Sequence, residues 1–165
     1  MSFVTSPQSP ATPDDHVIAF GEFWPAIDIN AFRNAMRIGG NLIPDARVVE
    51  ALVGGLIIVD DNLSVWRDSQ IAAGHEALAH IPSTEITVGA GQAAVIEPRL
   101  VRLFRRAVYA WATADLIETH RDVSATASGV KDANQVELTP DDHRRNGTHA
   151  IRAILGTSRT AVELI

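Results

Sequence analysis

The sequence HEALAH begins with His75 and ends with His80, and paired histidines of this kind suggest a metal site. In the zinc-binding motif HExxH, the two histidines lie one helical turn apart and share a helix face. The interval here is one residue longer, which turns the two side chains about 140° apart on a helix. His143 and His149 are spaced still more widely. The pattern therefore predicts surface or packing histidines and no metal site.

The stretch GAGQAA, residues 89–94, matches the dinucleotide-binding pattern GxGxxA and follows a strand-like EITV. A true fingerprint opens a helix within a βαβ unit, and an acidic residue ends the second strand about 20 residues later. Here the residues that follow predict a long helix, with Glu118 inside it. We therefore expect a glycine-rich loop and no cofactor.

The remaining candidates for catalysis are carboxylates and nucleophiles. Asp60 and Asp61 are adjacent, as are Asp141 and Asp142. Neighbours on a helix point about 100° apart, so neither pair forms a carboxylate dyad. The sequence contains no GxSxG elbow and no cysteine, which excludes the corresponding serine site, a thiolate metal site and a disulfide scaffold. The sequence predicts no enzyme, with no catalytic, metal or cofactor site.

The charges of the long helix expected after Pro98 have an unusual order. A helix dipole favours acidic residues at its start and basic residues at its end, by about 0.3–1 kcal/mol for each well-placed charge. This helix has the opposite order, with the basic half at Arg99, Arg102, Arg105 and Arg106 and the acidic half at Asp115, Glu118 and Asp122. Two interpretations remain open. The charges form a solvated helix face, or they form a head-to-tail contact between copies in a ring.

Composition indicates the fold class. A chain of 165 residues with 46% apolar, 21% charged and only 5% aromatic residues fits one domain with a core of Ala, Val, Ile and Leu. This favours closely packed helices, and we expect an all-α fold.

The net charge of −6 makes the chain a poor candidate for a protein that wraps DNA. The longest apolar run, residues 48–59, is short of the roughly 20 residues of a membrane helix. The first 22 residues lack the features of a signal peptide.

Helical periodicity and turn residues divide the chain. Residues 1–22, rich in Pro, Ser and Thr, are expected to be a flexible arm. A short helix capped by Asp28 or Asn30 follows. A second helix begins near Pro44, and glycines 54–55 inside it indicate either a bend or a close neighbour, of which we favour the neighbour. Its apolar stripe comprises Val48 or Val49, Leu52, Leu56, Val59, Leu63 and Trp66.

The second half begins with an irregular segment, residues 74–97, expected to be a long loop that holds a short hairpin arm. The long helix starts near Pro98, and a polar linker at 123–138 follows it. The last helix has Thr139 as its N-cap and ends at Gly156, before an extended tail at 157–165. The buried stripe of the long helix comprises Leu100, Phe104, Ala107, Trp111, Ala114 and Ile117.

Four sequence blocks carry a resemblance to a known family. They are FWPAIDINAFRNAMRIGG at 23–40, RRAVYAWATADLIETHRD at 105–122 with TASG soon after, AIRAILG at 150–156 and TAVELI at 160–165. In order and spacing the chain resembles the head completion (GPL-type) proteins of bacteriophages with contractile tails. The resemblance implies that residues 23–156 form a small helical bundle of the head–tail connector type, and it supplies no catalytic residues.

The resemblance also implies a function and partners. It implies a structural virion protein, made in the cytoplasm of a bacterial host, that completes and stabilises the DNA-filled head. The protein would bind beneath the portal protein, present the attachment surface for neck and tail completion proteins, and lie near packaged DNA. It would form a homo-oligomeric ring of about twelve copies, with no membrane partner.

The alternative is a small helical regulatory or DNA-binding module. Such a module needs a basic recognition helix. The nearest candidate is Arg144 and Arg145 in the last helix, beside Asp141 and Asp142.

Overall fold

The computed structural model of the chain describes residues 16–38, 43–89, 91, 94–124 and 138–157, without the side chains of 120–124. These residues form four α-helices, one 3-10 helix and two small sheets. In chain order the elements are β1 (Val17–Ile18), β2 (Ile27–Asp28), α1 (Ile29–Ala35), α2 (Asp45–Ala72), η1 (Leu78–His80), β3 (Glu85–Val88), β4 (Val95–Pro98), α3 (Arg99–Ser124) and α4 (Pro140–Ile154).

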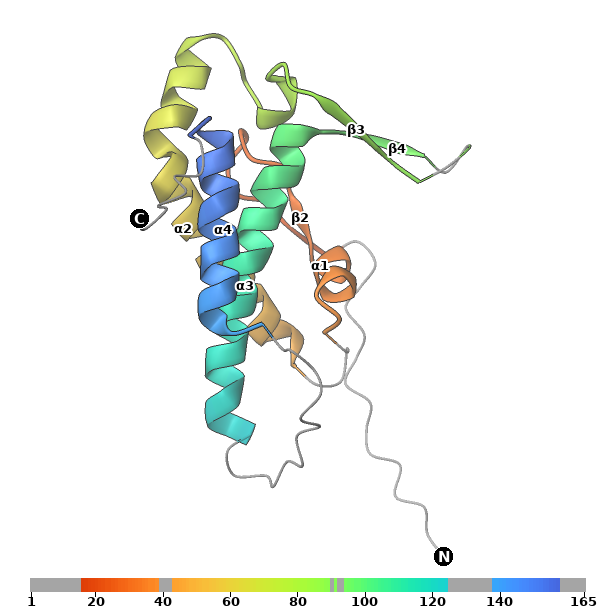
Figure 1. The fold of residues 1–165 in the computed structure, drawn as a ribbon, viewed down its shortest axis with the longest axis vertical. Coiled ribbons are helices and arrows are strands. Elements are labelled where there is room, and N and C mark those ends of the chain that lie inside the picture. The colour runs from red at the N-terminus through yellow and green to blue at the C-terminus, as the bar shows by residue number, and fades with distance from the viewer. Residues whose placement is uncertain (1–15, 39–42, 90, 92–93, 125–137, 158–165) are drawn as a thin grey trace, which may run out of the picture.

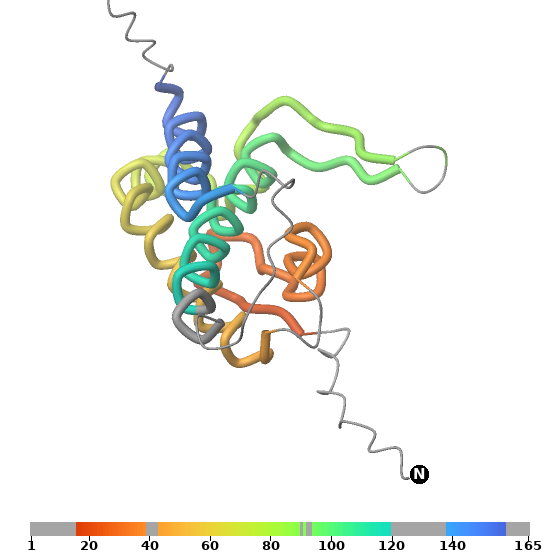
Figure 2. The backbone as a smooth tube through the Cα atoms, turned by 60° about the horizontal axis from the view of Figure 1, so that its bottom comes forward, coloured from red at the N-terminus to blue at the C-terminus, as the bar shows by residue number. Residues whose placement is uncertain are grey.

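Helix α3 is the centre of the molecule. It packs against both α2 and α4, and Figure 1 shows α2 and α4 on one side of it and α1 on the other. The hairpin formed by β3 and β4 projects away from the helices at the end where α3 begins, as both Figure 1 and Figure 2 show.

The expectation of an all-α fold is correct for the four helices, but the described residues also form two small antiparallel sheets. Strand β1 pairs with β2 in antiparallel register, with Val17 opposite Asp28. The second sheet is the β3–β4 hairpin. Two-residue strands such as β1 and β2 are too short to show an alternating pattern, so periodicity could not reveal them.

The hairpin expected within residues 74–97 is confirmed. Strand β3 is the predicted EITV segment, and it pairs antiparallel with β4, with Val88 opposite Val95 next to the turn. The glycine-rich stretch therefore joins two antiparallel strands. A dinucleotide-binding turn instead leads from a strand into a helix, so this geometry argues against cofactor binding there.

Helix α2 buries its predicted stripe. Val48, Leu52, Leu56, Val59 and Leu63 are fully buried, and Trp66 is partly buried against the same core. The predicted close neighbour of the glycine pair is also present. A Cβ atom on Gly55 would lie 2.8 Å from the carbonyl oxygen of Val108 in α3. The missing side chain therefore allows the two helix backbones to approach closely.

The ends of the other helices agree with the predicted capping residues. Asp28 caps α1 by accepting a hydrogen bond from the backbone N–H of Ala31, at 2.8 Å. Thr139 and Asp142 form a reciprocal capping box at the start of α4. Gly156, just beyond α4, has the positive φ of 71° that favours glycine at a helix end.

Aromatic residues gather at one end of the core. The Trp24 ring stacks on Phe104 of α3 with centroids 4.6 Å apart, and its Nε1–H donates to the Asp60 carboxylate of α2 at 2.7 Å. Asp60 also forms an ion pair with Arg67. These contacts fix the segment before β2 across both long helices.

Parts of three expected segments lie outside the described residues: 1–15 of the arm, 125–137 of the linker, and 158–165 of the tail. Within the arm, residues 16–22 are described and include β1.

The two adjacent glycines of α2 provide a matched test of this packing. Gly55→Ala is expected to destabilise the protein by about 1–3 kcal/mol, because its Cβ would meet the α3 backbone. Gly54→Ala has no atom within 4 Å of its Cβ and should stabilise the helix by about 0.5–1 kcal/mol. Urea unfolding of both variants measures the difference. Equal effects of the two substitutions would contradict the close approach of α2 and α3.

Candidate functional site

A groove of about 530 Å³ lies between α1, α3 and the first half of α4. Three of the four arginines of the expected contact, Arg102, Arg105 and Arg106, line it. Their spacing of three and four residues places them on one face of α3. Glu97, Tyr109 and His143 also line the groove. Its apolar side is formed by Ala31 and Ala35 of α1 and by Met36, the C-cap residue of that helix. We call it the arginine groove.

Glu97 organises two of these arginines. It is buried at the end of β4, and its carboxylate lies 2.7 Å from Arg105 and 3.4 Å from Arg102. A carboxylate just before a helix is also favoured by the positive end of the helix dipole. Glu97 therefore offsets part of the unfavourable charge order of α3. Sequence analysis missed this residue, although a carboxylate directly before an arginine-rich helix start was a usable signal.

The side chains of the other two arginines are exposed to solvent. Arg99 and Arg106 are exposed, and neither forms an ion pair within the described part of the chain. The backbone N–H of Arg99 donates to the carbonyl oxygen of Thr84 at 2.8 Å, which ties the base of the hairpin to the start of α3. The hairpin and Arg99 thus occupy neighbouring positions.

Two titratable groups of the groove are neutral near neutral pH. Burial raises the pKa of Tyr109 to about 12, and its ring meets Phe32 edge to face, with centroids 5.1 Å apart. Burial also lowers the pKa of His143, against the opposing effect of Asp142. The groove therefore combines the charges of its arginines and Glu97 with the neutral side chains of Tyr109 and His143.

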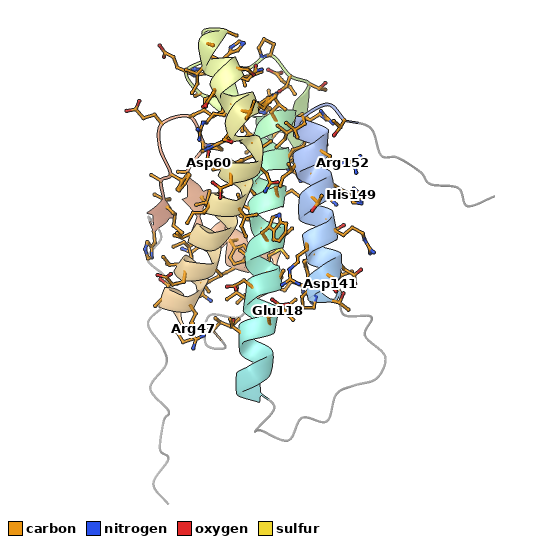
Figure 3. All side chains as sticks on the ribbon, turned by 90° about the vertical axis from the view of Figure 1, so that its left-hand side faces the viewer. Arg47, Asp60, Glu118, Asp141, His149 and Arg152 are labelled. Carbon is orange, nitrogen blue, oxygen red and sulfur yellow. The ribbon has the colours of Figure 1, made fainter. Side chains whose placement is uncertain are left out.

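The acidic half of α3 is not brought to these arginines in the same chain. Glu118 forms an ion pair with Arg144 of α4, and Arg144 also pairs with Asp141 at 3.0 Å. Figure 3 shows Glu118 and Asp141 on facing parts of the two helices. Asp115 is exposed, and the side chain of Asp122 lies outside the described residues.

A second groove, of about 920 Å³, lies beside the end of α2. Phe20, Trp24 and Ile71 line it together with charged residues, and His80 of the HEALAH sequence is at its edge. That sequence spans a turn and η1 instead of one continuous helix.

Across the described residues, no group of three or more His, Cys, Asp or Glu side chains is arranged to hold a metal ion. None of the helices in the same part of the chain has the length and apolarity to cross a membrane.

Comparisons with known proteins identify relatives. The family model described as phage head completion protein (GPL) matches residues 18–165. A head completion/stabilization protein of Escherichia phage P2 is 35% identical over 152 residues, which are 92% of this chain and 85% of the P2 protein. No solved structure shows a significant match.

The buried histidine of the groove predicts a pH dependence. Because the folded state disfavours protonated His143, the unfolded state binds more protons as the pH falls through 6.5, the ordinary value of the pKa. Stability should therefore decrease from about pH 7.5 to about pH 5.5. Thermal unfolding of the wild type and of His143→Gln across this range is the measurement. The substitution is expected to reduce the slope, and an unchanged slope would exclude His143 as its source.

Proposed function

This chain belongs to the phage head completion protein (GPL) family, and we propose that it is a structural virion protein that completes and stabilises the DNA-filled phage head. The observation that carries the proposal is the extent of the match. It begins at residue 18, inside β1, and includes every later element of the fold. The homology therefore covers the helical bundle, the projecting hairpin and the arginine groove together.

The finer proposal concerns where the protein binds. We place it beneath the portal protein in a homo-oligomeric ring of about twelve copies, where it offers a surface to neck and tail completion proteins and lies near packaged DNA. A fold of head–tail connector type accords with a helical bundle that presents both a groove and a projecting arm. The arginine half of α3, Arg99 to Arg106, is the proposed positive side of the contact between copies.

The proposal includes no catalytic role. In the described residues, the charged side chains closest to one another serve packing and capping. Glu97 pairs with two arginines, Asp60 pairs with Arg67, and Asp142 caps α4. Ion pairs and caps of this kind stabilise helices.

A DNA-binding module is less well supported by the geometry. Arg144 pairs with Glu118 and Asp141, and Arg145 pairs with Asp142. Arginines already neutralised by carboxylates release few counterions from DNA, so they contribute little to affinity for phosphates.

The proposal predicts binding to incomplete heads. Purified protein, added to DNA-filled, tailless heads that lack it, should bind saturably and reduce the leakage of DNA. Co-sedimentation measures the binding, and nuclease-sensitive DNA measures the leakage. Heads that already contain the protein are the control and should take up no more. If the protein neither binds the cognate heads nor retains their DNA, the proposed function is wrong.

A further inference from the structure

Helix α2 presents an outer face that the fold does not cover. The buried residues of α2 face α3, and the opposite side carries an alternation of carboxylates and large apolar residues. We call this side the α2 outer face, and it consists of Glu50, Ile57, Asp61, Val65, Asp68 and Ile71. Their spacing along the helix places them within one stripe.

The apolar residues of this face are not explained by the folded chain alone. Ile57 is 44% exposed, Val65 84% and Ile71 49%. All three are β-branched, so they are weaker helix formers than Ala, Glu or Lys at the same positions. They therefore leave much of their apolar surface in water and add no helix propensity where they lie. Contact with a partner would explain their presence.

A second surface lies on the other side of α3. Figures 1 and 2 show α2 on one side of the bundle and the hairpin on the other. Near the hairpin turn, Val88 and Val95 are a cross-strand pair on one side of the hairpin, and they are 43% and 63% exposed. The exposed Arg99 lies at the hairpin base, and the exposed Arg106 lies two turns further along α3 on the same helix face. We call these four residues the arginine–hairpin face.

We infer that the α2 outer face of one copy docks on the arginine–hairpin face of the next copy. The two surfaces are complementary in charge and apolarity, because one carries carboxylates, the other carries arginines, and both carry exposed β-branched apolar side chains. Because they lie on opposite sides of one subunit, their contact is heterologous and adds copies head to tail, as a ring requires. The inference rests on the proposed ring and names the surface that forms it.

The α2 outer face is the preferred complement because its carboxylates lie among exposed apolar residues. In the acidic half of α3, Glu118 pairs with Arg144 in its own chain, and Asp115 is exposed without an ion pair among the described residues. In the α2 outer face, Asp68 pairs with Arg67, whereas Asp61 forms no ion pair among the described residues and lies beside the 84% exposed Val65. The charge order of α3 drew attention to the arginines, and α2 is the partner that we propose for them.

Cross-linking between single-cysteine copies tests the contact directly, since the natural chain has no cysteine. Val65→Cys copies are mixed with Val95→Cys copies, bound to heads that lack the protein, and treated with a bismaleimide. Cross-linked dimers are expected in the mixture and not in either preparation alone. A mixture of Leu155→Cys with Val95→Cys is the matched control, because Leu155 is an exposed apolar residue outside both faces.

Charge reversal tests the electrostatic part. Asp61→Arg or Arg106→Glu alone should reduce the yield of cross-linked dimers about tenfold, and the two reversals in one chain should restore much of it. Neither residue forms an ion pair within the described part of the chain, so the folded monomer should tolerate each change. Circular dichroism confirms folding.

The outcomes separate this inference from the proposed function. If the wild type binds heads and retains DNA but the mixture gives no dimers beyond the Leu155 control, the docking surface is wrong and the function stands. If the wild type does not bind heads, the function fails, and the same cross-linking with concentrated protein in solution decides the contact. Dimers in the mixture together with rescue by the double reversal would support the inference.

Discussion

The close approach of α2 and α3 at Gly55 is the constraint on which the rest of the structure depends. Without a side chain at this position, the α2 backbone lies against Val108 and Ala112 of α3. Helix α3 meets α4 in a similar way, since Gly147 lies against the Trp111 ring. Small residues therefore allow one central helix to pack against two others at short distance. This explains how a chain with 5% aromatic residues can fill a core.

Much of the fold could be predicted because its signals are local. Apolar periodicity gave the long helices, and Asp28, Thr139 and Gly156 marked helix ends, since capping involves residues only a few positions apart. The β1–β2 pair depends instead on contacts between separate segments, such as the hydrogen bond from the Ile29 N–H to the His16 carbonyl oxygen. The bond from Trp24 to Asp60 joins residues 36 positions apart, and no local pattern reveals such a pair.

The candidate site shows the same division. The arginine row is a local pattern and was visible in the sequence. The groove beside it was not, because its walls come from α1, α3 and α4. The pairing of Glu118 with Arg144, 26 residues away, likewise depends on how two helices meet. Charge order along one helix therefore indicated which residues are unusual, and only the packing of helices showed which of them are already neutralised.

The distribution of charge bears on when copies would associate. A chain with a net charge of −6 repels other copies at long range, and salt screens that repulsion beyond about 8–10 Å. In the proposed contact, attraction between the arginine–hairpin face and the α2 outer face would act at short range, where the local charges are opposite and apolar side chains would be buried. Free copies would then associate weakly. Copies bound to a common surface would already be held close together, so they would lose less translational and rotational entropy when they associate. The proposed contact between opposite faces of an acidic subunit thus agrees with the proposal of a protein that would be monomeric before assembly and would form a ring on its binding site.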